Sequence, residues 1–265
     1  MRWEALTSPD FAKAVRDTGV CILPIGVLER HGSHLPLGTD YLNAHVLATL
    51  AAEKEPAVVF PHFYFGQIYE ALCFPGTVAL APALLLDLLQ SVLDEIARNG
   101  FRKIILYSGH GGNSGLVTLL TGSQIWQQKP YVLYVPTRHE SPERREKTAK
   151  LFQGQQVHDH GGESETSITL ANFPDMVRMD AVPEKPSLPL NRQENLAGVF
   201  TAVGWYANYP DHYAGDARFA SAEKGRLFRQ SQVDTLADCI VAVKADKVTR
   251  ALQDEFFIRL NQEIR

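Results

Sequence analysis

Apolar residues along the chain gather into short continuous runs, which are separated by longer amphipathic stretches. Four of these runs are rich in β-branched and aliphatic side chains and are predicted to be strands: Val20–Leu28, Ala57–Phe60, Lys103–Tyr107 and Tyr131–Val135. Their apolarity is continuous rather than alternating, which is typical of strands that are covered on both faces in a parallel sheet.

The stretches between the strands carry apolar residues at three- and four-residue steps, the spacing of one helix face. The clearest is Ala83–Arg98, which Asn99-Gly100 terminates. Four weaker patterns predict further helices: Tyr41–Lys54, Gly115–Gln127, Gln230–Lys244 and Thr249–Ile264. Because strands alternate with helices, we expect an α/β fold with a mostly parallel sheet and helices on both faces.

One region follows neither pattern. Residues 183–190 are rich in proline, and the chain from there to about Gly225 is rich in Gly, Tyr, Asn and Asp. No second set of strands follows, so we interpret this region as a long irregular excursion within a single domain that spans residues 1–265. Its aromatic stretch, Trp205–Tyr213, is expected either to line a pocket, here or in a neighbouring subunit, or to pack in a subunit interface.

Charge and composition narrow the class of protein. The 265 residues include 26 Lys and Arg against 30 Asp and Glu, a formal charge of −4, so electrostatics gives no reason to expect a nucleic acid or an anionic membrane as partner. No segment approaches the roughly 18–20 apolar residues that span a bilayer, and the N-terminus has no apolar signal core. Three scattered cysteines suit a reducing compartment, so we expect a cytoplasmic protein.

Histidine and carboxylate side chains are concentrated in three clusters, two of them directly after predicted strands. Because the carboxyl ends of parallel strands meet at one edge of a sheet, we expect these two clusters to lie close together. The clusters comprise Glu29, His31, His34 and Asp40; then His110; and then His158, Asp159, His160, Glu163 and Glu165.

Imidazole and carboxylate without thiolate form the ligand set of a catalytic Zn, Mn or Fe site. More than three or four such ligands suggest two metal ions that share a bridging carboxylate. The residues alone leave Glu163 and Glu165 as alternative ligands, and His34 as a substrate, supporting or turn-capping residue. Isolated histidines are interpreted as surface or core residues: His45, His62, His139 and His212.

The glycine-rich segment 109–115 joins a strand to a helix, as a nucleotide-binding loop does. However, Ser114 stands where the third glycine of G-x-G-x-x-G belongs, no acid ends the next strand, and the lysine of a Walker loop is missing. Neither Ser108 nor Ser114 lies in the G-x-S-x-G elbow of serine hydrolases. Metal chemistry is therefore the favoured interpretation.

At these residues the sequence resembles the creatininase (creatinine amidohydrolase) family. Four blocks, spread over residues about 20 to 225, carry the resemblance. They are the E-x-H-G-x-H-L-P block of residues 29–36 with Thr39-Asp40, then Gly109-His110-Gly111-Gly112-Asn113, then residues 160–167, and finally the G-D-x-x-x-A-S-x-E-K-G pattern of residues 215–225.

The resemblance implies a three-layer α/β/α fold, a homo-oligomer that is commonly a hexamer, and two divalent metal ions per chain (Zn, Mn or Fe). Glu29, Asp40 and His110 would hold one ion. His31, Asp40 and Glu165 would hold the other, with Asp40 bridging and with the H-x4-E spacing favouring Glu165 over Glu163. His160 falls at the position of the family's catalytic histidine.

Two departures concern the substrate. Family members that act on creatinine carry a glutamate where this chain has Gly112, and a tryptophan shortly before the histidine that matches His160, where residues 153–159 contain no aromatic. Both departures argue against creatinine itself. The resemblance also includes formamide deformylases, a peptide-cleaving maturase and hydrolases of cyclic sugar ketones.

We therefore predict an enzyme in which metal-activated hydroxide attacks the C–N amide bond of a small polar molecule, a cyclic amide or a formamide. His160 would donate a proton to the departing nitrogen, and His34 would orient the substrate. Two alternatives are a metal-dependent C–C hydrolase of a cyclic sugar ketone and a non-catalytic protein that binds metal or a small molecule.

Overall fold

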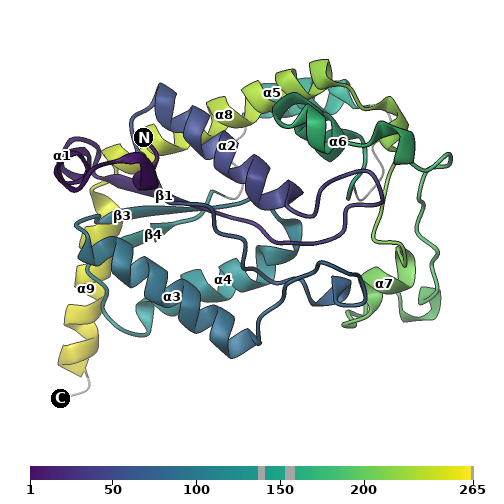
Figure 1. The fold of residues 1–265 in the computed structure, drawn as a ribbon. Coiled ribbons are helices and arrows are strands. Elements are labelled where there is room, and N and C mark those ends of the chain that lie inside the picture. The colour runs from purple at the N-terminus through teal and green to yellow at the C-terminus, as the bar shows by residue number, and fades with distance from the viewer. Residues whose placement is uncertain (137–140, 153–158, 264–265) are drawn as a thin grey trace.

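The computed structural model describes residues 1–136, 141–152 and 159–263. At its centre lie four parallel strands in the order β2-β1-β3-β4, drawn as arrows in Figure 1: β1 (Val20–Ile25), β2 (Val58–Val59), β3 (Lys103–Ser108) and β4 (Val132–Tyr134). β1 pairs with β3 along its whole length, from Val20 opposite Lys103 to Ile25 opposite Ser108. The predicted parallel sheet is therefore confirmed.

Helices cover both faces of this sheet and give the predicted three layers (Figure 1). One face packs against α1 (Ser8–Thr18), α3 (Pro82–Arg98) and α4 (Ser114–Gly122). The opposite face packs against α2 (Thr39–Lys54), α6 (Glu163–Asn172) and α8 (Ala222–Ala245). The remaining helices are α5 (Pro142–Leu151), α7 (Gly204–Asn208) and α9 (Val248–Glu263).

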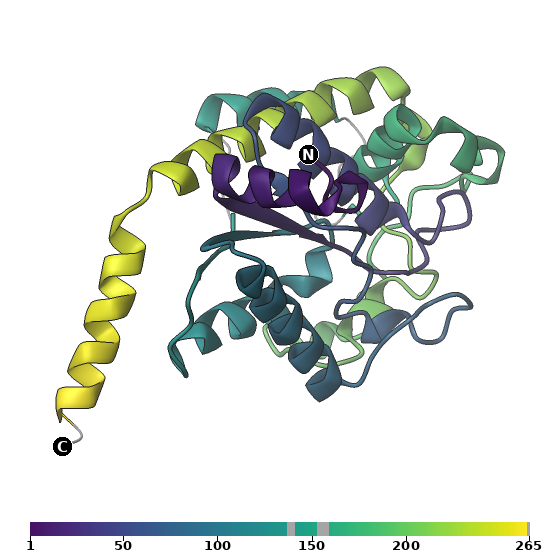
Figure 2. The same cartoon turned by 60° about the vertical axis from the view of Figure 1, so that its left-hand side comes forward.

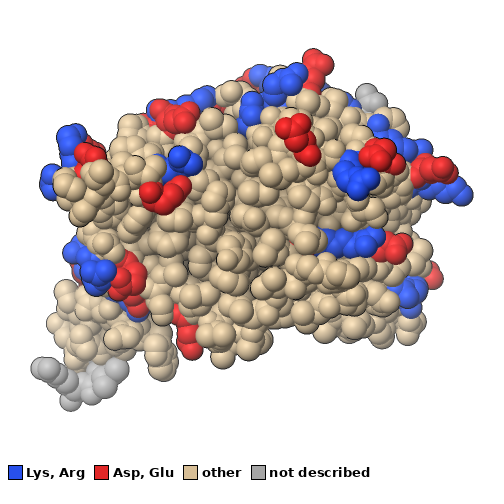
Figure 3. All heavy atoms as spheres, in the orientation of Figure 1, with Lys and Arg blue, Asp and Glu red and all other residues tan. Residues whose placement is uncertain are grey.

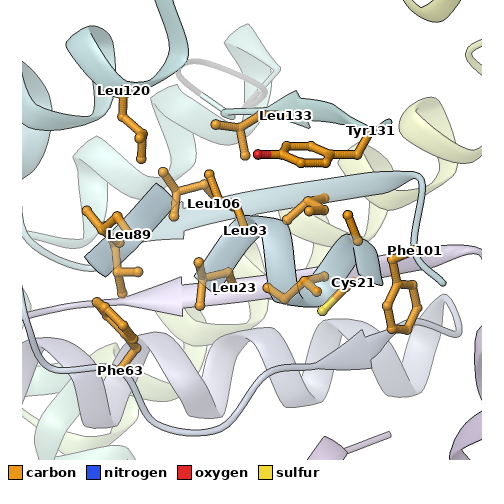
Figure 4. Packing of buried hydrophobic residues seen from close by; sticks show 14 of the residues in the cluster. Cys21, Leu23, Phe63, Leu89, Leu93, Phe101, Leu106, Leu120, Tyr131 and Leu133 are labelled. Atoms are coloured by element: carbon orange, nitrogen blue, oxygen red, sulfur yellow. The ribbon is translucent and has the colours of Figure 1, made fainter. Parts of the chain in front are cut away.

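Alternate residues of β1 fill two separate cores. Cys21 and Leu23 join the α3 side, where Leu89 and Leu93 pack over them, as Figure 4 shows. Ile22 points to the other face, into the core with α2 and α8. Each fully buried leucine contributes about 2 kcal/mol to folding, so the continuous apolarity of this strand is accounted for by burial on both faces.

The carboxyl ends of β1 and β3 press directly against the start of α2. A Cβ atom on Gly26 would lie 2.4 Å from the backbone nitrogen of Tyr41, and one on Gly109 would lie 2.7 Å from the carbonyl oxygen of Asp40. Only glycine fits such backbone-to-backbone contacts. The two glycines therefore bring the first turn of α2 onto the strand ends.

Several element boundaries differ from the sequence-based expectation. The first strand ends at Ile25 rather than Leu28, and the residue that follows, Gly26, meets the backbone of α2. α1, α5 and α6 were not expected. The apolar patterns of α5 and α6 are weak, whereas α1 is amphipathic between the N-cap Thr7 and the C-cap Gly19 and was overlooked. Residues 183–221 are largely irregular, as predicted. The short α7 is the longest helix in this fully described stretch, and α8 follows it. His139 and His158 lie outside the described residues.

The surface carries charges of both signs. On the face seen in Figure 3, Lys and Arg side chains are interspersed with Asp and Glu.

Figure 2 shows α9 extending away from the body of the molecule. In the described ranges, no helix combines the length and the apolarity that a membrane-crossing segment needs.

Candidate metal centre

Residues from four segments meet beyond the carboxyl ends of β1 and β3. Glu29 and His31 lie on the loop after β1, Asp40 in the first turn of α2, His110 just after β3, and Glu165 in the first turn of α6. The fold brings all five predicted ligands together, because the loop between β1 and α2 folds back over the strand ends.

Three ligand atoms converge at a first position. Nδ1 of His110 lies 2.8 Å from Oε1 of Glu29 and 2.9 Å from Oδ2 of Asp40. Nε2 of His110 faces the carbonyl oxygen of Gln67 at 3.0 Å, so the ring N–H donates there and Nδ1 is available as a ligand. Both carboxylate oxygens are buried and have no hydrogen-bond partner among the described residues. Buried acceptors that face a ring nitrogen in this way fit a cation between them.

A second position lies on the other side of Asp40. Nε2 of His31 is 3.0 Å from Oδ1 of Asp40 and 3.6 Å from Oε2 of Glu165. Nδ1 of His31 faces the backbone carbonyl of Glu29 at 3.3 Å. Each imidazole thus points one nitrogen at the carboxylates and the other at a carbonyl oxygen, the arrangement that orients metal-ligating histidines. Asp40 offers one oxygen to each position, as a bridging ligand does.

The three carboxylates of this centre attract positive charge. Burial opposes the charged imidazole, but Asp40 and Glu165 outweigh it and raise the pKa of His31 to about 10. Burial is likewise outweighed at His110, where Glu29 and Asp40 hold the pKa well above its ordinary value. Burial would raise the pKa of Glu29, but His160 and His110 hold it well below its usual range. For Glu165, burial dominates and raises the pKa to about 8. Protons and divalent metal ions therefore compete for the same site.

His160, the predicted catalytic residue, lies against this centre. Its ring stacks on His31 with centroids 4.2 Å apart, and its Nε2 donates to the carbonyl oxygen of Arg30 at 2.8 Å. Burial, followed by the charge of His31, holds the pKa of His160 well below its ordinary value. The imidazole is therefore neutral at physiological pH and starts as a proton acceptor.

Two residues that sequence reasoning left open have clear partners. Glu163 is fully buried and pairs with Lys224, whereas Glu165 faces His31. His34 is buried as well, and its Nε2 lies 2.8 Å from Oγ1 of Thr166, which fastens the loop after β1 to α6. The substrate-binding role of His34 stays a prediction.

Sequence reasoning missed His212, which was interpreted as a surface or core histidine. It is buried, and its Nε2 lies 2.6 Å from Oε2 of Glu29. His212 also belongs to a group with Glu29 and His160 whose ligand atoms all lie within 4.8 Å of one another. No motif marks this residue, because it comes from the irregular excursion, 183 positions after its partner. Its aromatic neighbours were the only available signal.

Gly112 stands beside the first position. A Cβ atom there would lie 2.4 Å from Nε2 of His110 and 2.9 Å from Oε1 of Gln67. Any side chain at this position requires His110 or Gln67 to move. The hydrogen bond that orients His110 therefore requires the absence of a side chain at Gly112.

The sequence is similar to known hydrolases. A model of the creatininase family, described as creatinine amidohydrolase, matches residues 4–240. The creatinine amidohydrolase of Pseudomonas putida is 30% identical over 235 residues, which cover 83% of this chain and 88% of that protein. The 3-dehydro-scyllo-inosose hydrolase of Thermotoga maritima is 25% identical over 272 residues, 96% of this chain and 84% of that protein.

The fold is similar to a solved structure as well. A creatininase mutant described as the Zn-Zn type superposes with a TM-score of 0.75 at 26% sequence identity, covering 90% of this chain and 96% of that one.

Proposed function

Since the chain belongs to the creatininase family of metal-dependent amidohydrolases, we propose that it uses two divalent metal ions to hydrolyse a C–N amide bond in a small polar substrate, a cyclic amide or a formamide. The observation that carries this proposal is the arrangement around Asp40. One of its oxygens faces Glu29 and His110, and the other faces His31, with Glu165 beyond it. Two ligand groups that share a carboxylate suit a pair of ions.

A pair of Zn, Mn or Fe ions bound there would lower the pKa of water to near neutrality and polarise a carbonyl group. The chain's own part is to hold the ligands in place and to move protons. His160 is neutral, so it accepts the proton that the attacking water loses and then passes it to the departing nitrogen. Its hydrogen bond to the carbonyl of Arg30 orients the ring for this transfer.

The local structure at Gly112 supports a substrate other than creatinine. Enzymes that act on creatinine carry a glutamate at the matching place, and here a side chain would collide with His110 and Gln67. We propose an amide substrate whose recognition does not depend on that carboxylate.

A second candidate is hydrolysis of a C–C bond in a cyclic sugar ketone. It is favoured by the similarity to the Thermotoga maritima inosose hydrolase, which extends over 96% of this chain. The metal centre and the proton transfer by His160 would serve both reactions. Parallel screening of formamides, cyclic amides and cyclic ketosugars separates the two candidates.

The finer properties of the assembly are also proposals. Four apolar residues of α9 recur at four-residue spacing and are exposed, which supports a homo-oligomer, a hexamer by family resemblance: Val248, Leu252, Phe256 and Leu260. A cytoplasmic location is supported by the scattered free cysteines. Light scattering of the purified protein measures the assembly directly.

The deciding experiment is elemental analysis of metal content in the wild type and in Asp40→Ala, with exposed Asp175→Ala as the matched control. We expect two equivalents per chain in the wild type and the control, and one or none in Asp40→Ala, together with loss of amide hydrolysis. A wild type that stays free of metal after reconstitution with Zn, Mn and Fe would refute the proposal. Two bound ions without turnover on any screened substrate would favour the non-catalytic binding protein.

A further inference from the structure

A chain of two hydrogen bonds leads from the irregular excursion to Glu29. Nε1–H of Trp205 donates to Nδ1 of His212 at 3.1 Å. An indole nitrogen can only donate, so Nδ1 of His212 carries no proton and the ring N–H lies on Nε2. That N–H donates to Oε2 of Glu29 at 2.6 Å. Trp205 therefore determines which tautomer His212 presents to the carboxylate.

The backbone around His212 is also held against the loop after β1. His212 adopts a left-handed conformation with φ of 51°, which is uncommon for a residue other than glycine. Its carbonyl oxygen accepts a hydrogen bond from the N–H of Gly32 at 3.1 Å, and Nε of Arg30 donates to the carbonyl of Asp211 at 3.0 Å. An unusual backbone conformation that aims a side chain at the site is typical of a functional position.

The consequence concerns the two oxygens of Glu29. Oε2 is occupied by His212, while Oε1 is buried, has no hydrogen-bond partner in the described part of the chain, and lies 2.8 Å from Nδ1 of His110. We propose that Trp205 and His212 are positioning residues, which hold Glu29 so that it binds the first metal ion through Oε1 alone. This inference rests on the proposed two-metal function.

The geometry favours this role over direct ligation by His212. A ligand needs a lone pair, and the Nε2 atom that points into the site carries hydrogen while the lone pair of Nδ1 is engaged by Trp205. Partners that orient a ligand in this way typically contribute about 10- to 100-fold to metal affinity.

Four variants test the proposal. Trp205→Phe removes the indole N–H and keeps an aromatic ring. His212→Asn tolerates the left-handed backbone, but its amide is too short to reach Glu29, whereas His212→Gln keeps an N–H donor near the place of Nε2. Trp126→Phe is the matched control, because Trp126 is 89% exposed and takes no part in the hydrogen bonds between Trp205, His212 and Glu29.

Two readouts are used. Competition with a chelator measures the affinities of both Zn²⁺ positions, and ¹⁵N NMR of the metal-free protein reports the tautomer of His212. We expect the Nε2–H tautomer in the wild type and a mixture in Trp205→Phe. The affinity of the first position should fall about 10- to 100-fold in His212→Asn and about 10-fold in Trp205→Phe. It should recover in part in His212→Gln, with the second position unchanged throughout.

Other outcomes would overturn the inference. Unchanged affinity in Trp205→Phe and His212→Asn, or equal weakening of both positions, would show that the pair does not position Glu29. Complete loss of one ion in both His212 variants, with the Nδ1–H tautomer in the wild type, would identify His212 as a ligand. If the wild type binds none of Zn, Mn and Fe after reconstitution, the proposed function fails together with this inference, whereas failure in the variants alone leaves the function intact.

Discussion

The two proposed metal positions that share Asp40 differ in how firmly the fold holds their other ligands. At the first position, Glu29 is fixed by His212 and His110 by the carbonyl of Gln67. At the second, Glu165 is partly exposed, and its Oε2 already accepts a hydrogen bond from the N–H of Gly161 at 2.7 Å. A shared ligand therefore does not make the two positions equal, and we expect the first position to bind its ion more tightly.

The largest effect is expected when a ligand of the first position is removed. His110→Ala removes one of three ligands, so we expect loss of the tighter ion and a fall in turnover of about 10³-fold or more, since an ion supplies several kcal/mol of transition-state stabilisation. Glu165→Gln is the matched variant and should lose only the weaker ion. Elemental analysis together with chelator titration checks both. Loss of the same ion from both variants would show that the two positions are not distinct.

The next effect separates catalysis from metal binding. His160 contacts the ring of His31 but donates to a backbone carbonyl, so His160→Ala should keep both ions and lose about 10²- to 10⁴-fold in turnover. Metal content and steady-state kinetics on the same preparation provide the check. Loss of an ion would instead make His160 a ligand, in line with its place in a group with His31 and Glu165.

The first position was also the easier one to predict from sequence. Glu29 and His110 follow continuously apolar strands, so the parallel sheet brings them together regardless of detail. Glu165 lies on α6, whose apolar pattern is too weak to show a helix, and chemistry alone could not separate it from Glu163. The family resemblance favoured Glu165, and the pairing of Glu163 with Lys224 agrees with that choice. His212 could not be predicted, because its contact with Glu29 depends on how an irregular loop folds.

A smaller effect tests whether backbone contact sets the first position. Gly26→Ala places a Cβ atom 2.4 Å from the backbone nitrogen of Tyr41, so α2 must move away from the strand end and take Asp40 with it. We expect a loss of about 3 kcal/mol in the free energy of unfolding and weaker binding of both ions. Gly115→Ala is the control, since its Cβ would meet no atom within 4 Å. Urea denaturation measures the free energy of unfolding of both variants. Equal values would show that the contact between Gly26 and α2 is not tightly packed.

The last effect, which is small at each pH step, tests the helix that carries Asp40. His45 lies on α2, is buried, stacks on His62 with centroids 3.8 Å apart, and has an Nε2 without a hydrogen-bond partner among the described residues. Burial, followed by the charge of His62, lowers the pKa of His45 to about 4.

The unfolded chain takes up a proton on His45 near pH 6.5, whereas the folded protein does not until about pH 4. This residue therefore stabilises the fold fully above pH 6.5, and its contribution is lost as pH falls towards 4, by up to about 1.4 kcal/mol per pH unit. In His45→Gln the decline between these values should be shallower than in the wild type, because the glutamine does not titrate. Urea midpoints at half-unit pH steps measure the difference. Parallel curves would mean that His45 is protonated in the folded protein, and that the α2 packing that supports Asp40 is looser than the structure indicates.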